Sequence, residues 1–505
     1  MVSNMDIENL FILLKCASTE FGENIALKSE SRQLTYQQLY MQSVAVANQL
    51  PQYEGTEAVA VLDMQRGLNY CIAVFALLAA GYTVCPFDES YTDIEVKAIV
   101  SQFKPSIIMC DRNTEKRHSC VYDIKEQYII YAEDYLTNED RSIINSDFTF
   151  KINEVAFMIA SSGSTGDLKL IECTHSAIYY AIAGINQRLC NSMDDCILDC
   201  LPLSFDYGLY QLFIAAYARC SLFFVERPYH LLEIPQIVLK NKITAFPATP
   251  QWLLHLLNAG RITPTFLRQL KYISSTGDVL PVDVIDQYLN INSNIKIYCM
   301  YGLTECKRVS ILLPEEYNDH KGSVGKPIDG VSIRIVNQEN GDTVVSGETG
   351  ELLVSGATLM KGYYRDVDLT NRAYQMREDG SRELHTGDIF YQDEEGFLYF
   401  SHRTQQFIKV GDQRISPRII EEYICAVEEV DDCAVFPYRK ESKEEIACVI
   451  YCRNVSEDLY SRIKKRIPSR FIPDHIKLIG EPFPVTRNGK RNNKLIKNLF
   501  LAEMS

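Results

Sequence analysis

The chain has 505 residues, of which 46% are hydrophobic and 23% are charged, and a formal net charge of −15. That length exceeds what one hydrophobic core supports, and the composition is that of an ordinary globular protein. The acidic balance argues against nonspecific nucleic-acid binding, and no apolar run approaches the ~20 residues that span a bilayer.

The N-terminal residues 1–8 lack the basic and then apolar order of a signal peptide, so we expect a cytoplasmic protein without a membrane partner. The 16 cysteines are scattered singly, and no C-x-x-C pair of the zinc-site type occurs. We therefore expect reduced thiols in the core or near the surface.

The first elements alternate between helix and strand. Residues 6–50 predict an amphipathic helix, a strand at 25–29 and a second helix after 34–36. A short buried strand at 58–62, a helix at 70–80 that ends at Gly81 and a strand at 82–86 follow. This order predicts a parallel sheet covered by helices.

The alternation resumes after residue 170. We expect helices at 176–190, 210–218, 250–258 and 282–288, and strands at 196–201, 221–225, 243–246, 271–275 and 295–299. From about residue 320, glycine-punctuated strands at 331–335, 350–354 and 397–400 indicate a smaller β subdomain. The tail predicts a compact α+β unit of ~100 residues, with strands at 408–410, 432–436 and 446–451 and helices at 416–427 and near 456–466.

A hydrophobic run at 155–160 breaks into residues 161–166, which are all Ser, Gly or Thr, and Lys169 follows. Small residues let the backbone approach a ligand closely, and hydroxyls with a lysine suit the β- and γ-phosphates of a nucleotide. The alternative is a flexible Ser/Gly turn. The order of a Walker A loop is missing.

Three further segments carry polar groups suited to a nucleotide. Residues 301–305, Tyr-Gly-Leu-Thr-Glu, follow a buried strand and suit a metal–phosphate site, since Mg²⁺ needs few protein ligands; the alternative is a Thr cap with Glu305 in the first helical turn. Asp388 follows Thr-Gly and could accept hydrogen bonds from ribose hydroxyls, or simply be a turn residue. Lys490, in a basic tail, is by itself most simply a solvated lysine.

Taken together, these segments resemble the adenylate-forming superfamily, which includes acyl-CoA synthetases, luciferase and the adenylation domains of peptide synthetases. Residues 162–166 with Lys169 match its phosphate loop, 301–305 match Y-G-x-T-E, 386–388 match T-G-D, and 484–490 match P-x-T-x-N-G-K. Gly350-Glu-Leu, with Gly356 and Gly362-Tyr363, matches a further signature, to which we assign a structural role. Five motifs occur in the superfamily's order.

The resemblance implies ATP and Mg²⁺ as cofactors. By it, Tyr301 lies against adenine, Thr304 contacts the α-phosphate, Glu305 holds Mg²⁺, and Lys490 bridges the substrate carboxylate and the α-phosphate. Asp388 and Arg403 face the ribose. The phosphate-loop residues are Ser162, Gly163, Ser164, Thr165, Gly166 and Lys169. A positioned ammonium with Mg²⁺ would offset the charge that grows during transfer.

The resemblance also implies an α/β fold with a large N-terminal domain (1–403) of helix-covered sheets plus a small β subdomain. A small, mobile α+β C-terminal domain (404–505) completes it. The chain departs from the family where Leu168 replaces Pro, Leu170 replaces Gly, Gln405 replaces the hinge Asp, Asp412 replaces a Gly and Ile419 replaces a Glu. The changes in the tail bear on the second half-reaction more than on the first.

Asp206 concerns the substrate. Ser204-Phe205-Asp206 resembles the segment in which amino-acid-activating members pair an Asp with the substrate's α-ammonium. A lone carboxylate at a pocket wall is costly without a cation. The alternative is a helix N-cap, and some acyl-activating relatives also carry Phe-Asp-Tyr-Gly. Correspondence with amino-acid-activating domains gives the rest of the pocket as Phe205, Tyr207, Tyr210, Ala245, Ile273, Ser275, Met300, Arg308 and Val309. Arg308 could pair with an acidic or polar substrate, or form a salt bridge elsewhere.

Three functional hypotheses follow. The first is ATP-dependent activation of a small amino acid as aminoacyl-AMP, with transfer to the phosphopantetheine thiol of a carrier protein supplied in trans. The second is a CoA ligase for a carboxylic acid that lacks an amine, and ammonium binding by Asp206 distinguishes the two. The third is a catalytically weak nucleotide-binding scaffold, which the changes at Leu168, Leu170 and Gln405 motivate.

Overall fold

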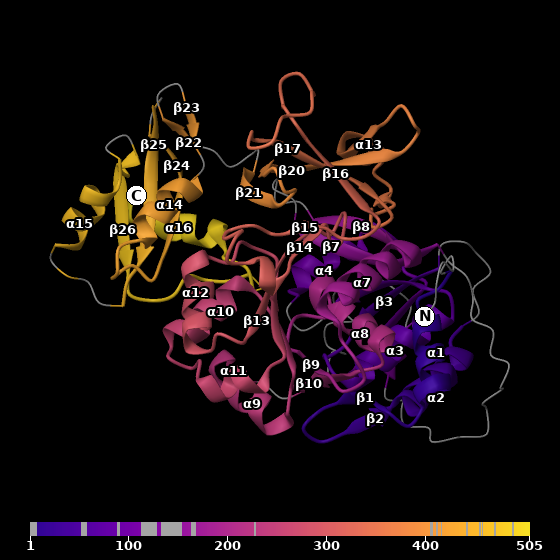
Figure 1. Cartoon of the computed structure of the whole chain (residues 1–505). Helices are drawn as coiled ribbons and strands as arrows, with labels where there is room; N and C mark the ends of the chain where they lie inside the picture. Colours follow the sequence, from indigo (N-terminus) through magenta and orange to yellow (C-terminus); the bar gives the residue numbers. More distant parts are fainter. Residues whose placement is uncertain are drawn as a thin grey trace.

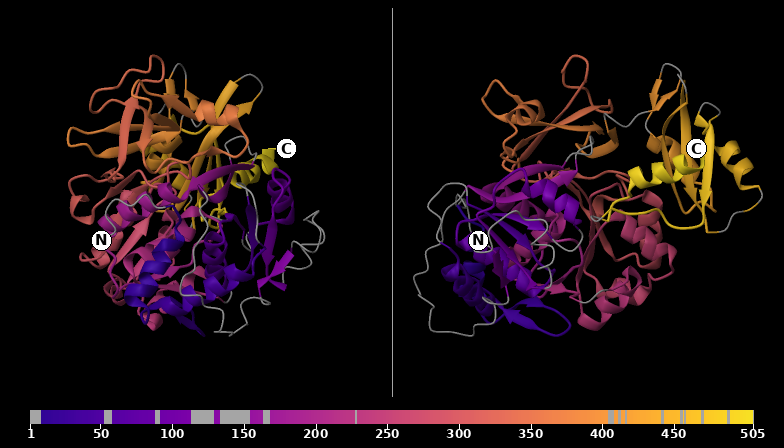
Figure 2. Two further views of the ribbon diagram at one scale, coloured as in Figure 1. Left: turned by 90° about the vertical axis from the view of Figure 1, so that its right-hand side faces the viewer. Right: turned by 180° about the vertical axis from the view of Figure 1, so that it is seen from behind.

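The computed structural model of the chain describes most of its residues. These are residues 8–51, 58–87, 91–112, 129–132, 154–162, 168–226, 229–403, 408–410, 413–415, 417–440, 443–453, 456, 458–468, 471–486 and 489–504. Two large sheets with their helices form the body of the molecule (Figure 1). A β subdomain lies over one end of the sheets, and a C-terminal unit lies beside it (Figure 2).

The first large sheet runs in the order β15-β14-β13-β12-β11-β9-β10-β1-β2. Its strands from β1 through β10, β9, β11 and β12 to β13 pair in parallel, as the alternation of helices and strands predicts. The strands are β1 (Ile25–Lys28), β2 (Gln33–Thr35), β9 (Cys196–Asp199), β10 (Ser221–Phe224), β11 (Ala245–Ala248), β12 (Tyr272–Ser275), β13 (Lys296–Tyr301), β14 (Ser310–Leu312) and β15 (Lys326–Pro327).

The second large sheet runs in the order β18-β8-β7-β4-β3-β5-β6. Strands β7, β4, β3, β5 and β6 pair in parallel, whereas β8 returns antiparallel to β7. The strands are β3 (Val59–Asp63), β4 (Thr83–Phe87), β5 (Ile107–Cys110), β6 (Ile129–Tyr131), β7 (Val155–Ser162), β8 (Leu168–Thr174) and β18 (Gly362–Tyr363).

Helices fill the space between the sheets and cover their outer faces. α3 is buried along its whole length because both sheets contribute side chains to the core around it. A second core lies on the other face of the first sheet, under α9 to α12. The helices are α1 (Phe11–Phe21), α2 (Tyr36–Gln49), α3 (Leu68–Ala79), α4 (Asp93–Val100), α7 (His175–Leu189), α8 (Asp206–Ala218), α9 (Ile234–Asn241), α10 (Pro250–Asn258), α11 (Pro264–Gln269) and α12 (Val282–Ile291). Short 3-10 turns lie at Leu231–Glu233 and Pro314–Glu316.

The β subdomain and the C-terminal unit have their own sheets. The subdomain pairs β16 (Val331–Val336), β17 (Gly350–Gly356), β20 (Arg382–Gln392) and β19 (Tyr374–Met376) in that order, with β21 (Leu398–Arg403) on β20 and α13 (Val367–Ala373) beside them. The C-terminal unit contains β22 (Ile408–Val410), β23 (Gln413–Ile415), α14 (Pro417–Cys425), β24 (Asp432–Lys440), β25 (Lys443–Tyr451), α15 (Leu459–Arg466), β26 (His475–Ile479) and α16 (Asn493–Met504). Its apolar residues form two clusters, one on each face of the sheet that β24 to β26 make.

The predicted α/β fold is therefore confirmed, including the small β subdomain. Sequence patterns missed the helices α4, α9, α11, α13 and α16 and the strands β2, β5, β6, β8, β14, β15, β18, β19, β23 and β26, most of which are short. The boundary placed between residues 403 and 404 stays a prediction, and Gln405 and Asp412 lie outside the described residues.

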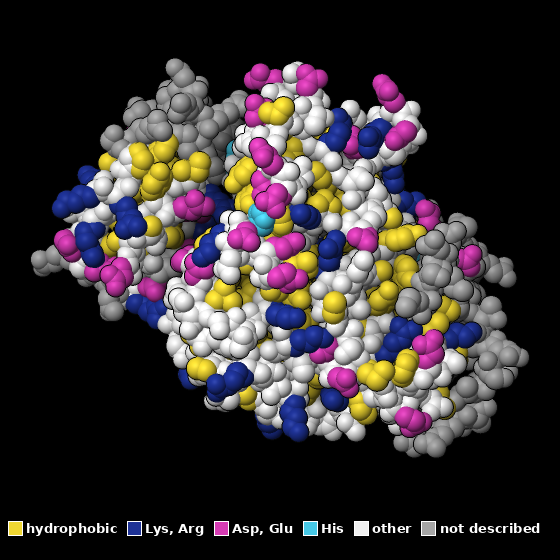
Figure 3. Space-filling view, viewed as in Figure 1, with side chains coloured by type: hydrophobic (Ala, Val, Ile, Leu, Met, Phe, Trp, Pro, Cys, Tyr) yellow, Lys and Arg dark blue, Asp and Glu magenta, His cyan; other side chains and the backbone are white. Residues whose placement is uncertain are grey.

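The surface charges, the cysteines and the apolar helices can be compared with what the composition predicted. On the face shown in Figure 3, the Lys and Arg side chains of the described residues are interspersed with Asp and Glu. Every cysteine that the structure describes is a free thiol, and most are buried. Within the described ranges, no helix combines the length and apolarity that a bilayer crossing requires.

Candidate active site

The predicted phosphate loop joins β7 to β8. Gly163, Ser164, Thr165 and Gly166, together with the side chain of Ser162, lie outside the described residues. Lys169 stands opposite Ser161 in the β7–β8 ladder. Its ammonium nitrogen lies 5.5 Å from the ring centre of Tyr363, on the neighbouring strand β18. Lys169 thus lies beside Tyr363, the residue that contacts Glu305 of the next motif.

Glu305 is connected to Lys169 through Tyr363. The Tyr363 hydroxyl donates a hydrogen bond of 3.0 Å to Oε1 of Glu305. Residues 302–309 form turns after β13, so the alternative that Glu305 begins a helix is wrong. A Cβ on Gly302 would lie 2.2 Å from the carbonyl oxygen of Lys307, so the turn requires glycine there. Thr304 lies in the same turn, partly buried.

These residues fit Mg²⁺. A carboxylate keeps acceptor positions beyond the one that Tyr363 occupies, and Mg²⁺ is held by one or two carboxylates with water or phosphate oxygens. Among the described residues no group of three or more His, Cys, Asp and Glu gathers into a metal site. Glu305 is therefore the carboxylate of this turn that would hold the ion.

Asp388 lies at the other side of Tyr301. It is 1% exposed, and its Oδ2 accepts a hydrogen bond of 2.7 Å from the Tyr301 hydroxyl. Arg403 Nε lies 3.0 Å from Oδ1, because β20 and β21 place Asp388 and Arg403 opposite each other. Asp388 lies inside β20, so the alternative of a simple turn residue is wrong.

Asp388 has the acceptor capacity that a ribose needs. Burial raises the pKa of Asp388, whereas Arg403 and the hydrogen bond from Tyr301 lower it. Oδ1 accepts no hydrogen bond from the described residues, in spite of the ion pair with Arg403. A buried carboxylate oxygen of this kind fits a hydroxyl donor such as a ribose.

Lys490 reaches the site from the C-terminal unit. Its ammonium nitrogen lies 5.5 Å from the ring centre of Phe205, at the start of α8. Gly277 has φ +98°, and a Cβ there would lie 3.1 Å from the Cε of Lys490. Burial and Arg403 lower the pKa of Lys490, whereas Asp278, Asp206 and Glu305 raise it. Lys490 is thus directed into the site, not into open solvent.

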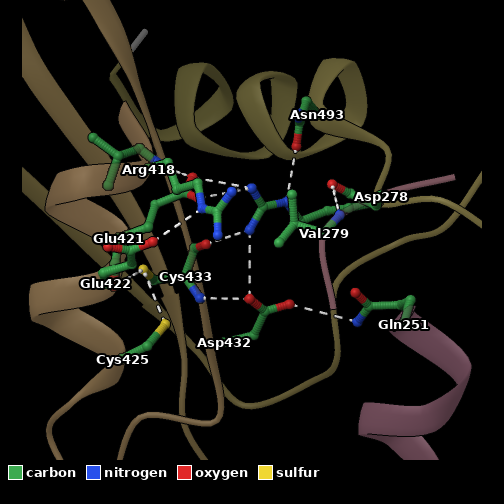
Figure 4. Close-up of polar contacts among 12 residues, drawn as sticks. Gln251, Asp278, Val279, Arg418, Glu421, Glu422, Cys425, Asp432, Cys433 and Asn493 are labelled. Carbon is green, nitrogen blue, oxygen red and sulfur yellow. Dashed lines mark hydrogen bonds and ion pairs between the residues drawn. The ribbon is translucent and has the colours of Figure 1, made fainter. Parts of the chain in front are cut away.

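Arg491, the next residue, holds this lysine's segment to the C-terminal unit. Its guanidinium contacts both carboxylate oxygens of Glu421 at 3.0 and 3.1 Å and Oδ1 of Asp432 at 3.4 Å, and it donates to the carbonyl of Cys433. Asp432 in turn accepts a hydrogen bond of 3.5 Å from Gln251 of α10, which Figure 4 shows reaching across from the large domain. This group, the Arg491 cluster (Arg491, Glu421, Asp432, Cys433 and Gln251), links the two parts next to Lys490.

Asp206 lies at the head of α8. The N-cap of this helix is Phe205 and Asp206 is its first residue, so the N-cap alternative is wrong. Asp206 is 8% exposed and lines a cavity of about 10 Å³, room for about one water molecule. Burial raises the pKa of Asp206, and Arg308, Lys490 and the Thr304 hydroxyl oppose that rise.

The cavity contains part of the predicted side-chain pocket. Its wall is formed by Ile185, Leu189, Asp206, Tyr207, Tyr210, Gln211, Ile214, Ser274, Met300, Lys307 and Arg308. Ile273 and Ser275 do not line this cavity, because side chains alternate along β12, and their place in the substrate pocket stays a prediction. Tyr272 and Ser274 face the cavity side, whereas Ile273 packs into the second core.

Three other predicted pocket residues also lie outside this cavity. Ala245 and Val309 are fully buried in the main core. Phe205 lies near Lys490 and packs against the main core. The pairing of the strands and the path of the turn after β13 decide where these residues lie, and no sequence pattern specifies either of them.

Several residues near the site were not predicted from the sequence. Tyr363 was assigned to a structural signature only, although it hydrogen bonds Glu305. The charge of Asp278 raises the pKa values of Lys490, Arg491 and Arg403. In the sequence, the glycine and the carboxylate at 277–278, shortly after a buried strand, could have indicated Asp278 as a site residue.

Comparison with known proteins agrees with this geometry. The family described as "AMP-binding enzyme" matches residues 14–364, and "AMP-binding enzyme C-terminal domain" matches residues 419–490. The chain belongs to the AMP-binding enzyme family. The predicted superfamily and the predicted enzyme class, an AMP-forming ligase, are confirmed by these matches.

Among curated relatives, bacitracin synthase 2 of Bacillus licheniformis is 24% identical over 486 residues, which are 94% of this chain and 18% of that protein. 4-Coumarate–CoA ligase-like 9 of Arabidopsis thaliana is 26% identical over 445 residues, 85% of this chain and 78% of the relative. The chain thus spans less than a fifth of the length of bacitracin synthase 2 and of gramicidin S synthase 2.

Solved structures share the fold. NpsA of Klebsiella oxytoca, in complex with 3-hydroxyanthranilyl-AMSN, superposes with a TM-score of 0.85 at 18% identity and covers 98% of this chain and 100% of that one. O-succinylbenzoate coenzyme A synthetase of Bacillus subtilis, in complex with ATP and magnesium ion, gives 0.82 at 21% identity, with coverages of 96% and 99%. That neighbour holds the ATP and magnesium ion that the resemblance predicts for this chain.

Proposed function

We propose that this ligase activates a small amino acid as aminoacyl-AMP, with release of pyrophosphate. It then transfers the aminoacyl group to the phosphopantetheine thiol of a separate carrier protein. One observation carries the proposal: a buried carboxylate, Asp206, lines the cavity beside which Lys490 lies. An α-ammonium would offset the desolvation of that carboxylate.

In the first half-reaction, a carboxylate oxygen of the amino acid attacks the α-phosphorus of ATP. The bond from that phosphorus to the bridging oxygen breaks, and pyrophosphate leaves. Lys490, which Asp278, Asp206 and Glu305 favour in its charged form, offsets negative charge on the carboxylate and the α-phosphoryl oxygens. Asp388 and Tyr301 orient the nucleoside.

Mg²⁺, held by Glu305, would supply electrostatic stabilisation of the phosphate oxygens. Lys169, on the strand that follows the phosphate loop, lies beside Tyr363, whose hydroxyl donates a hydrogen bond to Glu305. The chain's own residues therefore divide the work: Lys169 and Glu305 face the phosphates, Asp388 the ribose, and Asp206 the amine.

In the second half-reaction, the thiol sulfur attacks the acyl carbon, the thiol proton is released, and AMP leaves with the mixed-anhydride oxygen. The acceptor is proposed from the resemblance to amino-acid-activating members, and Gln405 and Asp412 at the predicted hinge are outside the described residues.

A CoA ligase for an acid without an amine is the second candidate, and one observation favours it. Arg308 lies near Asp206 and already lowers the pKa of that carboxylate. Asp206 therefore has a cation nearby without any substrate amine. Ligases that act with CoA are also among the relatives.

Exchange of radiolabelled pyrophosphate into ATP tests the proposal, with a panel of amino acids, their deaminated acids and no acid. Asp206→Asn keeps the shape of the side chain and removes its charge. The matched control is Asp93→Asn, because Asp93 is also the first residue of a helix, the exposed α4. CoA and pantetheine are then offered as thiols to the preformed adenylate.

Exchange with an amino acid that falls about 10- to 100-fold in Asp206→Asn, with Asp93→Asn unchanged, supports the proposal, since a charge-paired hydrogen bond contributes ~1.5–3 kcal/mol. Exchange with a deaminated acid, indifferent to Asp206, supports the CoA ligase instead. A protein that binds MgATP but exchanges with no acid is the weak scaffold.

A further inference from the structure

The cavity beside Asp206 also contains a buried cation that the chemistry above does not use. Arg308 is 5% exposed, and Nη1 donates a hydrogen bond to Oγ1 of Thr276. Its guanidinium carbon lies 5.8 Å from the ring centre of Tyr207, another residue of the cavity wall. Nε has no hydrogen-bond partner among the described residues.

Arg308 does not form a salt bridge elsewhere. Within the described parts of the chain it makes no ion-pair contact, and the neighbouring Asp206 makes none either. The titratable groups that face Arg308 are Tyr207, Asp206, Cys306 and Tyr210, and among them only Asp206 is an acid. Burying a guanidinium without a contacting carboxylate costs folding free energy. We therefore expect Arg308 to bind an anionic partner.

Resting on the function proposed above, we propose that the substrate is a small amino acid whose side chain ends in a carboxylate, which Arg308 binds. Lys307, which also lines the cavity, donates a hydrogen bond of 3.4 Å to the carbonyl of Thr304, and the three other charged groups at the site match the three charges of such a molecule. Asp206 faces the α-ammonium, Lys490 the α-carboxylate, and Arg308 the side-chain carboxylate.

The chemistry of the guanidinium favours this substrate class. A guanidinium presents a planar set of donors that matches a carboxylate with two hydrogen bonds, and its free Nε adds one more donor. The cavity between Tyr207, Tyr210 and Met300 has a volume of about 10 Å³, room for about one water molecule, so the side chains around it must move to admit a carboxylate. An amino dicarboxylic acid with one or two methylenes needs the smallest movement.

Pyrophosphate exchange with matched acids tests the inference on the unmodified enzyme. The panel is aspartate, glutamate, asparagine, glutamine, alanine and succinate, which separates the side-chain charge from the amine. We expect one acidic amino acid to exceed its own amide at least about 100-fold in kcat/KM, because a site built for a polar group rejects analogues that lack it.

Variants then assign the selectivity to Arg308. Arg308→Met keeps the length and loses the charge, and we expect it to lose about 100-fold on the acidic amino acid while its activity with alanine or the amide rises. Arg308→Lys restores part of the preference. Arg268→Met, in the exposed part of α11, is the control for loss of an arginine. Thermal unfolding and MgATP binding show whether each variant is folded.

The outcomes distinguish this inference from the function on which it rests. Preference for a neutral amino acid, with selectivity unchanged in Arg308→Met, overturns the assignment of Arg308 and leaves amino-acid activation standing. Exchange with succinate but with no amino acid keeps the anionic group and overturns the amine. Exchange with no acid, by a protein that binds MgATP, overturns both.

Discussion

Replacing Arg491 by Met is predicted to slow adenylation although Lys490 itself is unchanged. Arg491 is the residue after Lys490, and it is held by both oxygens of Glu421 and by Asp432. Asp432 contacts Gln251 of the large domain, so the same cluster fixes the C-terminal unit against the site. Without the Arg491 guanidinium, the segment that carries Lys490 loses its contacts with the C-terminal unit and, through Asp432, its connection to the large domain.

The magnitude follows from burial. Side chains of Arg491 and Glu421 are 18% and 17% exposed, so breaking their pair leaves a largely buried charge. Removing one partner of a buried pair costs ~3–5 kcal/mol, and we take about 3 kcal/mol because some solvent reaches both groups. If all of it were lost from the positioning of Lys490, the rate would fall roughly 100-fold. We expect a fall of about 10- to 100-fold, the remainder appearing as lower stability.

The assay is pyrophosphate exchange with kcat and KM measured separately, together with thermal unfolding. Arg462→Met is the matched control, since Arg462 on α15 of the same unit pairs with Glu429 and with the exposed Asp458. An exposed pair of that kind contributes ~0–1 kcal/mol. The double variant Arg491→Met with Glu421→Gln removes both charges, so we expect it to recover stability but not rate.

A folded Arg491→Met enzyme that exchanges at the normal rate would refute the reasoning. It would show that Lys490 is positioned by the contacts of its own segment with Gly277, Thr249 and Trp252. A double variant that recovers the rate along with stability would mean that the cluster acts only on folding.

Three further predictions concern single groups. Asp388→Asn should raise the KM for ATP about 10- to 100-fold with a smaller change in kcat, because a hydrogen bond to a charged acceptor contributes ~1.5–3 kcal/mol; an unchanged KM would remove Asp388 from the ribose site. Burial raises the pKa of Asp199 from 3.8 to about 7, so the folded state binds the proton more tightly and stability falls as pH rises from about 4 to 7, by up to about 4 kcal/mol. Asp199→Asn should therefore melt higher than the unmodified protein at pH 8 and similarly at pH 4, and equal melting temperatures at both would contradict this. Burial lowers the pKa of His175 from 6.5 to about 3, so stability is lost as pH falls below about 6.5, by up to about 5 kcal/mol at pH 3. His175→Gln, which can still accept the hydrogen bond from the Leu10 N–H, should flatten that acid slope, and an identical slope would argue against a neutral buried histidine.

Local patterns in the sequence were sufficient for the element types and for the motif positions. Alternating helix and strand segments gave the α/β class, and the apolar runs at 58–62 and 82–86 became paired parallel strands because their side chains are buried on both faces. The motifs at 301–305 and 386–388 were recognised by their resemblance to the superfamily's Y-G-x-T-E and T-G-D, since each run alone also fits a cap or a turn.

The tertiary structure decided what local patterns could not. Which side of β12 faces the cavity depends on its register with β11 and β13, so Ser274 lines it and Ser275 does not. The link from Lys169 through Tyr363 to Glu305 joins residues that are 58 or more positions apart, and no local pattern encodes such a contact. Whether Arg308 has a carboxylate partner is likewise a question about neighbours in space. The sequence by itself determined which chemical groups the protein has, and only the packing of the sheets decided which of them share one cavity, because burial and charge pairing act across distances in space that separation along the chain does not report.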